Sequence, residues 1–141
     1  MSYQSEQEIL HLVTGFRECT LPKSRWTHEA HLTTGIWFHK MHTEFEAISY
    51  LRSGIISYNV ASGGKNTPEE GYHETLTLFW SRIISNFVLE NSKLPVVELC
   101  NAFLKSTLAS KELPLTYYSK EILFSTKARA RWVEPDLKKL R

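Results

Sequence analysis

Four of the six histidines in the chain lie in one stretch, RWTHEAHLTTGIWFHKMH, at positions His28, His31, His39 and His42. Neutral imidazole is the side chain that most often binds a metal or transfers a proton near neutral pH. If the stretch is a helix, the four rings share one arc of its surface, roughly 80° wide. Apolar residues also lie opposite that arc, which favours a central helix packed on both sides. The alternative is that the histidines face water.

A fifth histidine, His73, lies in the first turns of a second helix, which the sequence predicts over residues 68–90. On that helix His73 falls within the apolar stripe, so we expect it to point toward the core. In an up-down-up arrangement, this helix runs parallel to the one that ends near residue 41. Parallel helices begin at the same end of the bundle, so His28, His31 and His73 are predicted to meet there.

Three histidines that meet at one end of a bundle resemble a catalytic zinc centre, which has three protein ligands and one open position. Glu70 precedes His73 by three residues, as in the Glu-x-x-His pairs of metal-binding bundles. The predicted ligands of a divalent metal such as zinc are therefore His28, His31, His73 and Glu70. Glu29 and Glu74 are the candidate catalytic carboxylates. The corresponding activity is a metal-dependent, hydrolase-like reaction on a small molecule, with a metal-bound water as the nucleophile.

A second interpretation of the same residues needs no metal. Converging helix N-termini present unpaired N–H groups, which suit a phosphate or a carboxylate. In this interpretation, hydroxyl groups for hydrogen bonds to the ligand come from Thr27, Tyr72, Thr75 and Tyr118. The loop ASGGKNTPEEG would close over the ligand, with Lys65 as a counter-charge. The protein would then be a metal-free binding protein for a small anion.

A third interpretation assigns no chemistry to the histidines. His73 would form one buried hydrogen bond in the core, while His28 and His31 would face solvent. The protein would then be a helical interaction module without catalysis. Its partner would be a second copy, in a homodimer formed through an exposed apolar helix face.

Helical start signals occur throughout the chain, and strand signals are poor. Capping boxes begin at Ser5 and Thr43, and N-caps are expected at Thr27, Thr67, Ser119 and Ser125, with a further helix starting near Pro95. Two short helices are expected after the last two of these caps. The sequence therefore predicts an all-α fold: a single-domain antiparallel bundle of about five to seven helices over residues 1–141.

The composition limits the function further. A formal net charge of +2, with the charges scattered, gives no reason to expect nucleic-acid binding. No apolar run approaches the ~20 residues that a membrane helix needs, and the polar, acidic N-terminus is no signal peptide. Cys19 and Cys100 lack any framework spacing, so both are expected to be free thiols. These features together predict a cytoplasmic protein.

Three segments, WTHEAHL, GYHETLTLFW and ARARWVEPDLK, resemble those of a family of small uncharacterised bacterial proteins. That family has a His-x-x-His segment followed by a Tyr-His-x-Thr-x-Thr segment, and the resemblance extends from about Leu21 onward. It implies an all-α fold and no named activity. The residues that it marks as site residues are His28, His31, His73, Thr75 and Thr77.

Overall fold

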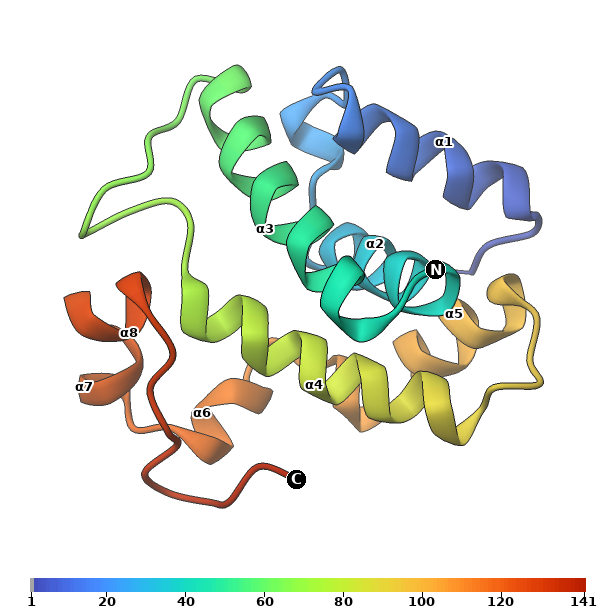
Figure 1. Cartoon of the computed structure of the whole chain (residues 1–141). Helices are drawn as coiled ribbons and strands as arrows, with labels where there is room; N and C mark the ends of the chain where they lie inside the picture. The colour runs from blue at the N-terminus through green and yellow to red at the C-terminus, as the bar shows by residue number, and fades with distance from the viewer. Residues whose placement is uncertain (1) are drawn as a thin grey trace.

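The computed structural model describes residues 2–141, which contain helices and no strands (Figure 1). The α-helices are α1 (Glu6–Arg17), α2 (His28–Met41), α3 (Glu44–Ala61), α4 (Glu74–Glu90), α5 (Val96–Lys105), α6 (Leu113–Tyr117), α7 (Lys120–Leu123) and α8 (Thr126–Ala130). Two short 3-10 turns, η1 (Lys23–Arg25) and η2 (Thr107–Ala109), complete the described structure. The all-α prediction is confirmed, and α6 is the one helix that was not expected.

Most helices begin where their capping residues predicted. The Ser5 hydroxyl accepts a hydrogen bond from the Glu8 N–H, and the Glu8 carboxylate accepts one from the Ser5 N–H. Thr43 and Glu46 form the same reciprocal pair at the start of α3. The predicted caps of α2, α7 and α8 are also observed. Each cap satisfies a backbone donor that the first turn of a helix leaves without an intrahelical partner.

The start of α4 is the main difference from the predicted elements. The hydroxyl of Thr67 accepts hydrogen bonds from the N–H groups of Glu69 and Glu70, so it closes a local turn instead of capping a helix. Gly71 then takes a positive φ of 84°, and a Cβ there would lie 2.0 Å from the Lys65 carbonyl oxygen. The helix therefore begins only at Glu74, and the preceding loop is longer than predicted.

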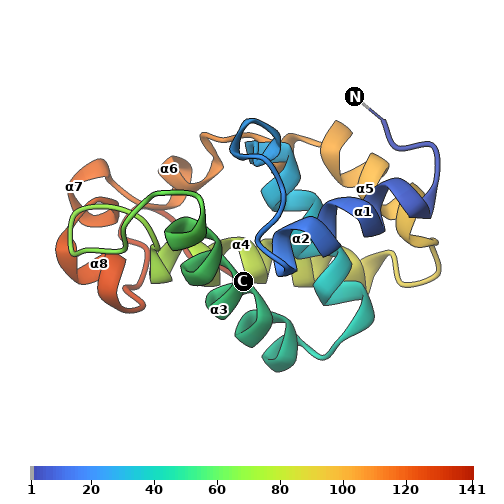
Figure 2. The same ribbon diagram turned by 90° about the horizontal axis from the view of Figure 1, so that it is seen from above.

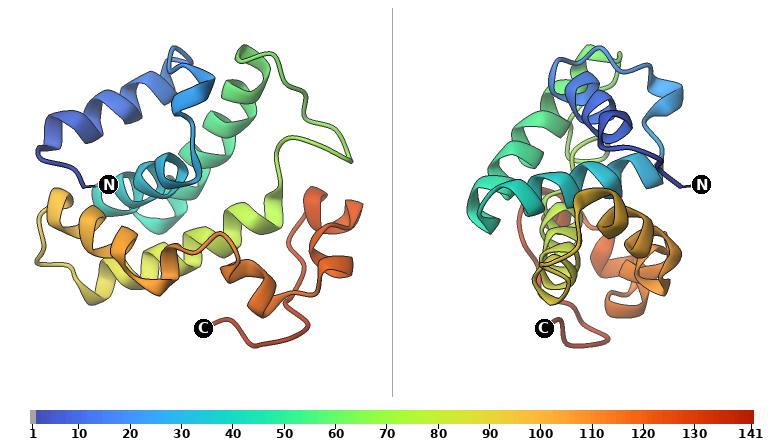
Figure 3. Two further views of the ribbon diagram at one scale, coloured as in Figure 1. Left: turned by 180° about the vertical axis from the view of Figure 1, so that it is seen from behind. Right: turned by 90° about the vertical axis from the view of Figure 1, so that its right-hand side faces the viewer.

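Helix α2 is the centre of the fold, because it packs against α1, α3, α4 and α5. Five consecutive residues of α2, Leu32 to Ile36, are buried, and so are Phe38 and His39, which fits a helix covered on both sides. It does not run parallel to α4 but crosses it (Figures 2 and 3). Gly35 lies where the two helices approach, since a Cβ there would be 2.9 Å from Cδ1 of Ile84.

The segment after α6 packs against the beginning of α4, through hydrogen bonds from His73 to Leu123 and from Thr75 to Arg131. Helix α8 contacts α4, and the final segment returns to α6 through a hydrogen bond from the Leu137 N–H to the Tyr117 carbonyl. This region therefore fixes the end of α4 where the predicted site begins. None of the described helices combines the length and apolar character needed to cross a membrane.

Candidate functional site

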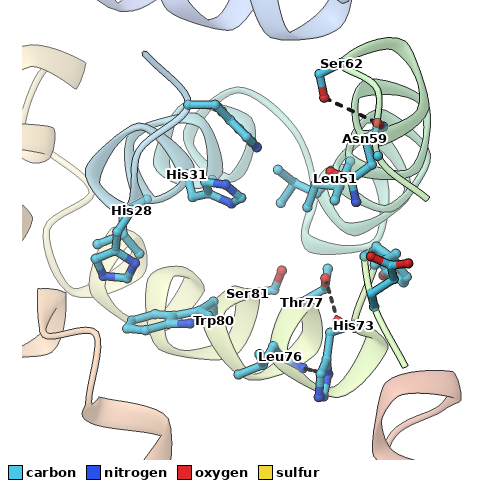
Figure 4. A pocket seen from close by; sticks show the side chains of 18 of the residues that line it. His28, His31, Leu51, Asn59, Ser62, His73, Leu76, Thr77, Trp80 and Ser81 are labelled. Atoms are coloured by element: carbon cyan, nitrogen blue, oxygen red, sulfur yellow. Dashed lines mark hydrogen bonds between the residues drawn. The ribbon is translucent and has the colours of Figure 1, made fainter. Parts of the chain in front are cut away.

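A pocket of about 600 Å³ lies between α2, α3 and α4, beside the loop over residues 62–73 (Figure 4). Its volume is within the range of roughly 300–1,000 Å³ that is typical of small-molecule sites. Apolar and aromatic side chains supply much of the wall: Trp26, Leu32, Leu51, Ile55, Leu76, Trp80 and Ile84. A few polar groups lie among them, and their hydrogen bonds decide what the pocket can bind.

His31 points from α2 into this pocket (Figure 4). Its ring centroid lies 3.9 Å from that of Trp26. Desolvation by the surrounding protein, with a smaller effect of nearby His28, lowers the pKa of His31 to about 4, although the side chain stays accessible from the pocket. Within residues 2–141 neither ring nitrogen of His31 hydrogen-bonds to a protein group. At neutral pH it is therefore a neutral imidazole with one donor and one acceptor available to a ligand.

Two hydroxyl groups of α4, on Thr77 and Ser81, point toward the same space as His31 (Figure 4). The Thr77 hydroxyl donates to the His73 carbonyl oxygen at 3.0 Å, so it can still accept a hydrogen bond. Ser81 is 2% exposed, and its hydroxyl has no hydrogen-bond partner in the described part of the chain. Burying an unpaired polar group costs about 1–3 kcal/mol, so a ligand that hydrogen-bonds to Ser81 would offset this cost.

His73 borders the pocket, but both of its ring nitrogens bond to the protein. It is the N-cap of α4: Nδ1 accepts a hydrogen bond from the Leu76 N–H at 3.1 Å. Nε2–H donates to the Leu123 carbonyl oxygen at 2.7 Å, which ties α4 to α7. Burial lowers the pKa of His73, consistent with this neutral tautomer. Its ring therefore has no free nitrogen for a metal or a ligand.

His28 also forms a hydrogen bond that joins two segments of the fold. It is the first residue of α2, and its Nε2–H donates to the Ala109 carbonyl oxygen at 2.9 Å. The ring also meets Trp80 edge-on, with centroids 5.5 Å apart. His28 thus fastens the start of α2 to the segment after α5 and forms part of the pocket wall.

The four predicted metal ligands, His28, His31, Glu70 and His73, all line the pocket, but they are not arranged as one metal-binding group. Throughout residues 2–141, no group of three or more His, Cys, Asp or Glu side chains is arranged to hold a metal ion. Glu70 lies on the exposed loop, and the rings of His28 and His73 bond to different backbone segments. The prediction assumed parallel helices with aligned starts, whereas α2 crosses α4 and α4 starts later than expected.

Neither of the two candidate catalytic carboxylates, Glu29 and Glu74, lines the pocket. Glu29 is exposed on α2 and lines two neighbouring depressions instead of the pocket. Glu74 accepts two hydrogen bonds from the Arg52 guanidinium, at 3.0 and 2.6 Å, and one from the Tyr72 hydroxyl at 2.6 Å. Burial raises the pKa of Glu74, but these hydrogen bonds outweigh it and leave the pKa below its usual value. Glu74 therefore joins α3 to α4 as a charged carboxylate.

The five predicted ligand-binding hydroxyls divide into two groups. Tyr72 and Thr77 line the pocket. Thr27 caps α2 by accepting from the Ala30 N–H. Thr75 is buried: its hydroxyl donates to the Arg131 carbonyl oxygen and accepts from the Val133 N–H. The hydroxyl of Thr27 therefore stabilises the start of α2, and the hydroxyl of Thr75 holds the C-terminal segment in place.

Tyr118, like Thr75, has a hydroxyl that bonds to the C-terminal segment. Its side chain is buried, and its hydroxyl donates to the Val133 carbonyl oxygen at 2.6 Å. It does not line the pocket. The hydroxyl groups of Tyr118 and Thr75 thus bond to the same short segment of backbone, residues 131–133, which explains why these two polar groups lie in the interior.

Several residues of the pocket were not predicted, and Lys23, Ser81 and Lys111 are among them. A signal for Ser81 exists in the sequence, because Thr77, Ser81 and Ser85 follow one another at intervals of four on a helix that is otherwise apolar on that side. The two lysines carry no such signal. They reach the pocket from loops whose positions depend on tertiary packing.

A comparison of the chain with protein-family models, with curated proteins and with solved structures finds no match. The resemblance carried by the His-x-x-His and Tyr-His-x-Thr-x-Thr segments therefore stays a prediction. The function has to be argued from the pocket itself.

Proposed function

We propose that the protein binds a small organic molecule in the pocket between α2, α3 and α4, without a metal. One observation carries the proposal. In a cavity of about 600 Å³ with largely apolar walls, the neutral ring of His31 and the unpartnered hydroxyl of Ser81 point into the same space.

This arrangement has the general chemistry of a small-molecule site. Apolar walls favour a ligand with an apolar body, at roughly 25 cal/mol for each Å² removed from water. A few fixed polar groups then orient that ligand. His31 offers one donor and one acceptor, and Ser81 offers a hydroxyl that now bonds to nothing in residues 2–141.

The hydrogen bonds that His28 and His73 make through Nε2 support binding without a metal. A metal held by His28 and His73 through Nε2 would have to displace their hydrogen bonds to the carbonyl oxygens of Ala109 and Leu123. The metal-dependent, hydrolase-like enzyme stays a prediction. The probe-binding experiment below, in EDTA and after zinc is added back, separates it from the metal-free binding protein.

Filling the pocket tests the proposal. We expect protein kept in EDTA to bind the neutral fluorescent probe N-phenyl-1-naphthylamine saturably. The Ser81→Leu variant should bind it at least about tenfold more weakly, a loss of about 1.4 kcal/mol. The added side chain occupies the cavity, and it removes a buried hydroxyl that has no partner, so the fold should survive. Circular dichroism and urea unfolding check that it does.

Ser57→Leu is the matched control, because Ser57 is exposed on α3 and does not line the pocket. It should leave probe binding unchanged. The proposal is wrong if wild-type protein shows no saturable binding, or if folded Ser81→Leu binds like wild type. Binding that appears only after zinc is added back would instead support the metal-dependent interpretation.

A homodimer also stays a prediction. Phe45 and Val60 on α3 are 82% and 62% exposed, so an exposed apolar helix face of the expected kind exists. A cytoplasmic location is likewise a prediction, based on free thiols at Cys19 and Cys100.

A further inference from the structure

We infer that the ligand of this pocket is an organic acid, and that its anionic group binds at the start of α2. The inference rests on the proposed pocket and adds the chemical class of the ligand and its orientation. It is carried by the distribution of charge around the pocket, together with the unpartnered buried hydroxyl of Ser81.

Positive charge gathers at the start of α2. Lys23 lies in η1, immediately before this helix, and Lys111 lies two residues after Ala109, whose carbonyl accepts the hydrogen bond from His28. Both lysines line the pocket. The first N–H groups of a helix lack intrahelical acceptors, and the helix dipole adds partial positive charge there. Of the first turn of α2, His28 and His31 line this pocket, so an anion there would interact favourably with the two lysines and with the helix dipole.

The other end of the pocket has no such excess. Lys65 and Glu70 both line it from the loop over residues 62–73, so their charges offset each other. Glu29, the acidic residue in the first turn of α2, does not line this pocket; it lines the neighbouring depressions, one of which it shares with Lys111. The charge is therefore asymmetric, and it favours one orientation of an acid.

The space beyond the lysines suits the apolar part of such a molecule. Trp80 and Leu76 of α4 lie on one side, and Leu51 and Ile55 of α3 lie on another. In Figure 4 the ring of His31 and the hydroxyl of Ser81 point into the space between these walls. The ligand class is thus a carboxylate, sulfonate or phosphate monoester that carries an apolar, ring-sized body.

Two probes with the same aromatic body test the role of charge. One is 8-anilino-1-naphthalenesulfonate, which is an anion, and the other is neutral N-phenyl-1-naphthylamine. We expect the double variant Lys23→Ala/Lys111→Ala to bind the anionic probe about tenfold more weakly, because it removes two positive charges that attract the anionic group. Its affinity for the neutral probe should change by less than about twofold.

The double variant Lys93→Ala/Lys139→Ala is the matched control. It removes the same net charge from exposed positions that do not line the pocket, so both probes should bind as they do to wild type. Lys65→Ala tests the orientation, and it should weaken the anionic probe less than either Lys23→Ala or Lys111→Ala does. Competition by benzoate and by phenyl phosphate then shows which acid group displaces the anionic probe better.

The outcomes separate this inference from the proposed function. If the neutral probe binds and Lys23→Ala/Lys111→Ala weakens neither probe, or weakens both equally, the pocket stands and the inference is wrong. The inference is also wrong if the control double variant weakens the anionic probe as much. If neither probe binds to wild-type protein, the proposed function fails as well.

Discussion

The His73→Ala variant should lower the free energy of unfolding by about 2–4 kcal/mol, even in protein kept in EDTA. The substitution removes the N-cap of α4, which is worth about 0.5–2 kcal/mol. It also leaves the buried Leu123 carbonyl without its donor, at a cost of about 1–3 kcal/mol. Urea unfolding followed by circular dichroism measures the loss.

Two further variants separate the role of capping from general effects of removing a histidine. His73→Asn keeps a good N-cap but cannot reach Leu123 in the same way, so it should recover part of the lost stability. His11→Ala removes an exposed histidine of α1 and should change the stability little. If His73→Ala is as stable as wild type in EDTA and differs only when zinc is present, His73 is a metal ligand and does not stabilise the fold through its two hydrogen bonds.

Acidification should destabilise the protein between about pH 6.5 and pH 4.5, well before most carboxylates are protonated. The main cause is His39 of α2, which is only 7% exposed. Burial lowers its pKa to about 4, against about 6.5 in the unfolded chain. Over this range the unfolded state therefore binds more protons than the folded state. Stability is fully present above about pH 6.5 and is lost as the pH falls toward the folded pKa.

The expected loss assigned to His39 is about 2–3 kcal/mol over those two pH units, since one unit of pKa difference corresponds to 1.36 kcal/mol. The pKa of His31 is lowered in the same direction, but its ring remains accessible from the pocket and should contribute less. Urea unfolding at a series of pH values gives the profile.

His39→Gln isolates this contribution, because glutamine is neutral at every pH in the range. Its stability should fall less steeply with acid than that of wild type, while His11→Gln should follow the wild-type profile. Equal slopes for His39→Gln and wild type would contradict the assignment. The lowered carboxylate pKa values, such as that of Glu46, act below about pH 4.5 and are common to all three proteins.

Local signals in the sequence predicted the helices well because capping depends on neighbouring residues. The pairs Ser5–Glu8 and Thr43–Glu46 satisfy backbone donors three residues away, so their geometry is independent of the rest of the fold. Helix α6 was not predicted, because it has only five residues and no side chain caps its start.

The start of α4 was predicted too early because the sequence offers two candidate N-caps, Thr67 and His73. Thr67 followed by Pro68 and two glutamates is typical of a helix N-terminus. In the folded protein, however, His73 caps the helix, and Leu123 from α7 accepts its second hydrogen bond. That bond joins residues 50 apart in the chain, so no local pattern could reveal it.

The site was predicted in part. The predicted site residues that do line one pocket, as expected for these two motifs, are His28, His31, Glu70, Tyr72, His73 and Thr77. The convergence on His73 was expected from a parallel arrangement of two helices, and crossing angles depend on which side chains pack between them. Gly35 against Ile84 determines that approach here. A glycine in a helix does not by itself show which partner lies against it.

Chemical-shift mapping of the EDTA-treated protein with N-phenyl-1-naphthylamine tests the central claim most directly. If the pocket binds small molecules without a metal, the largest amide shifts should fall on its lining in all three helices, at residues such as His31, Leu51 and Ser81. Shifts confined to the exposed face of α3 near Phe45 and Val60, or no shifts until zinc is added, would contradict it.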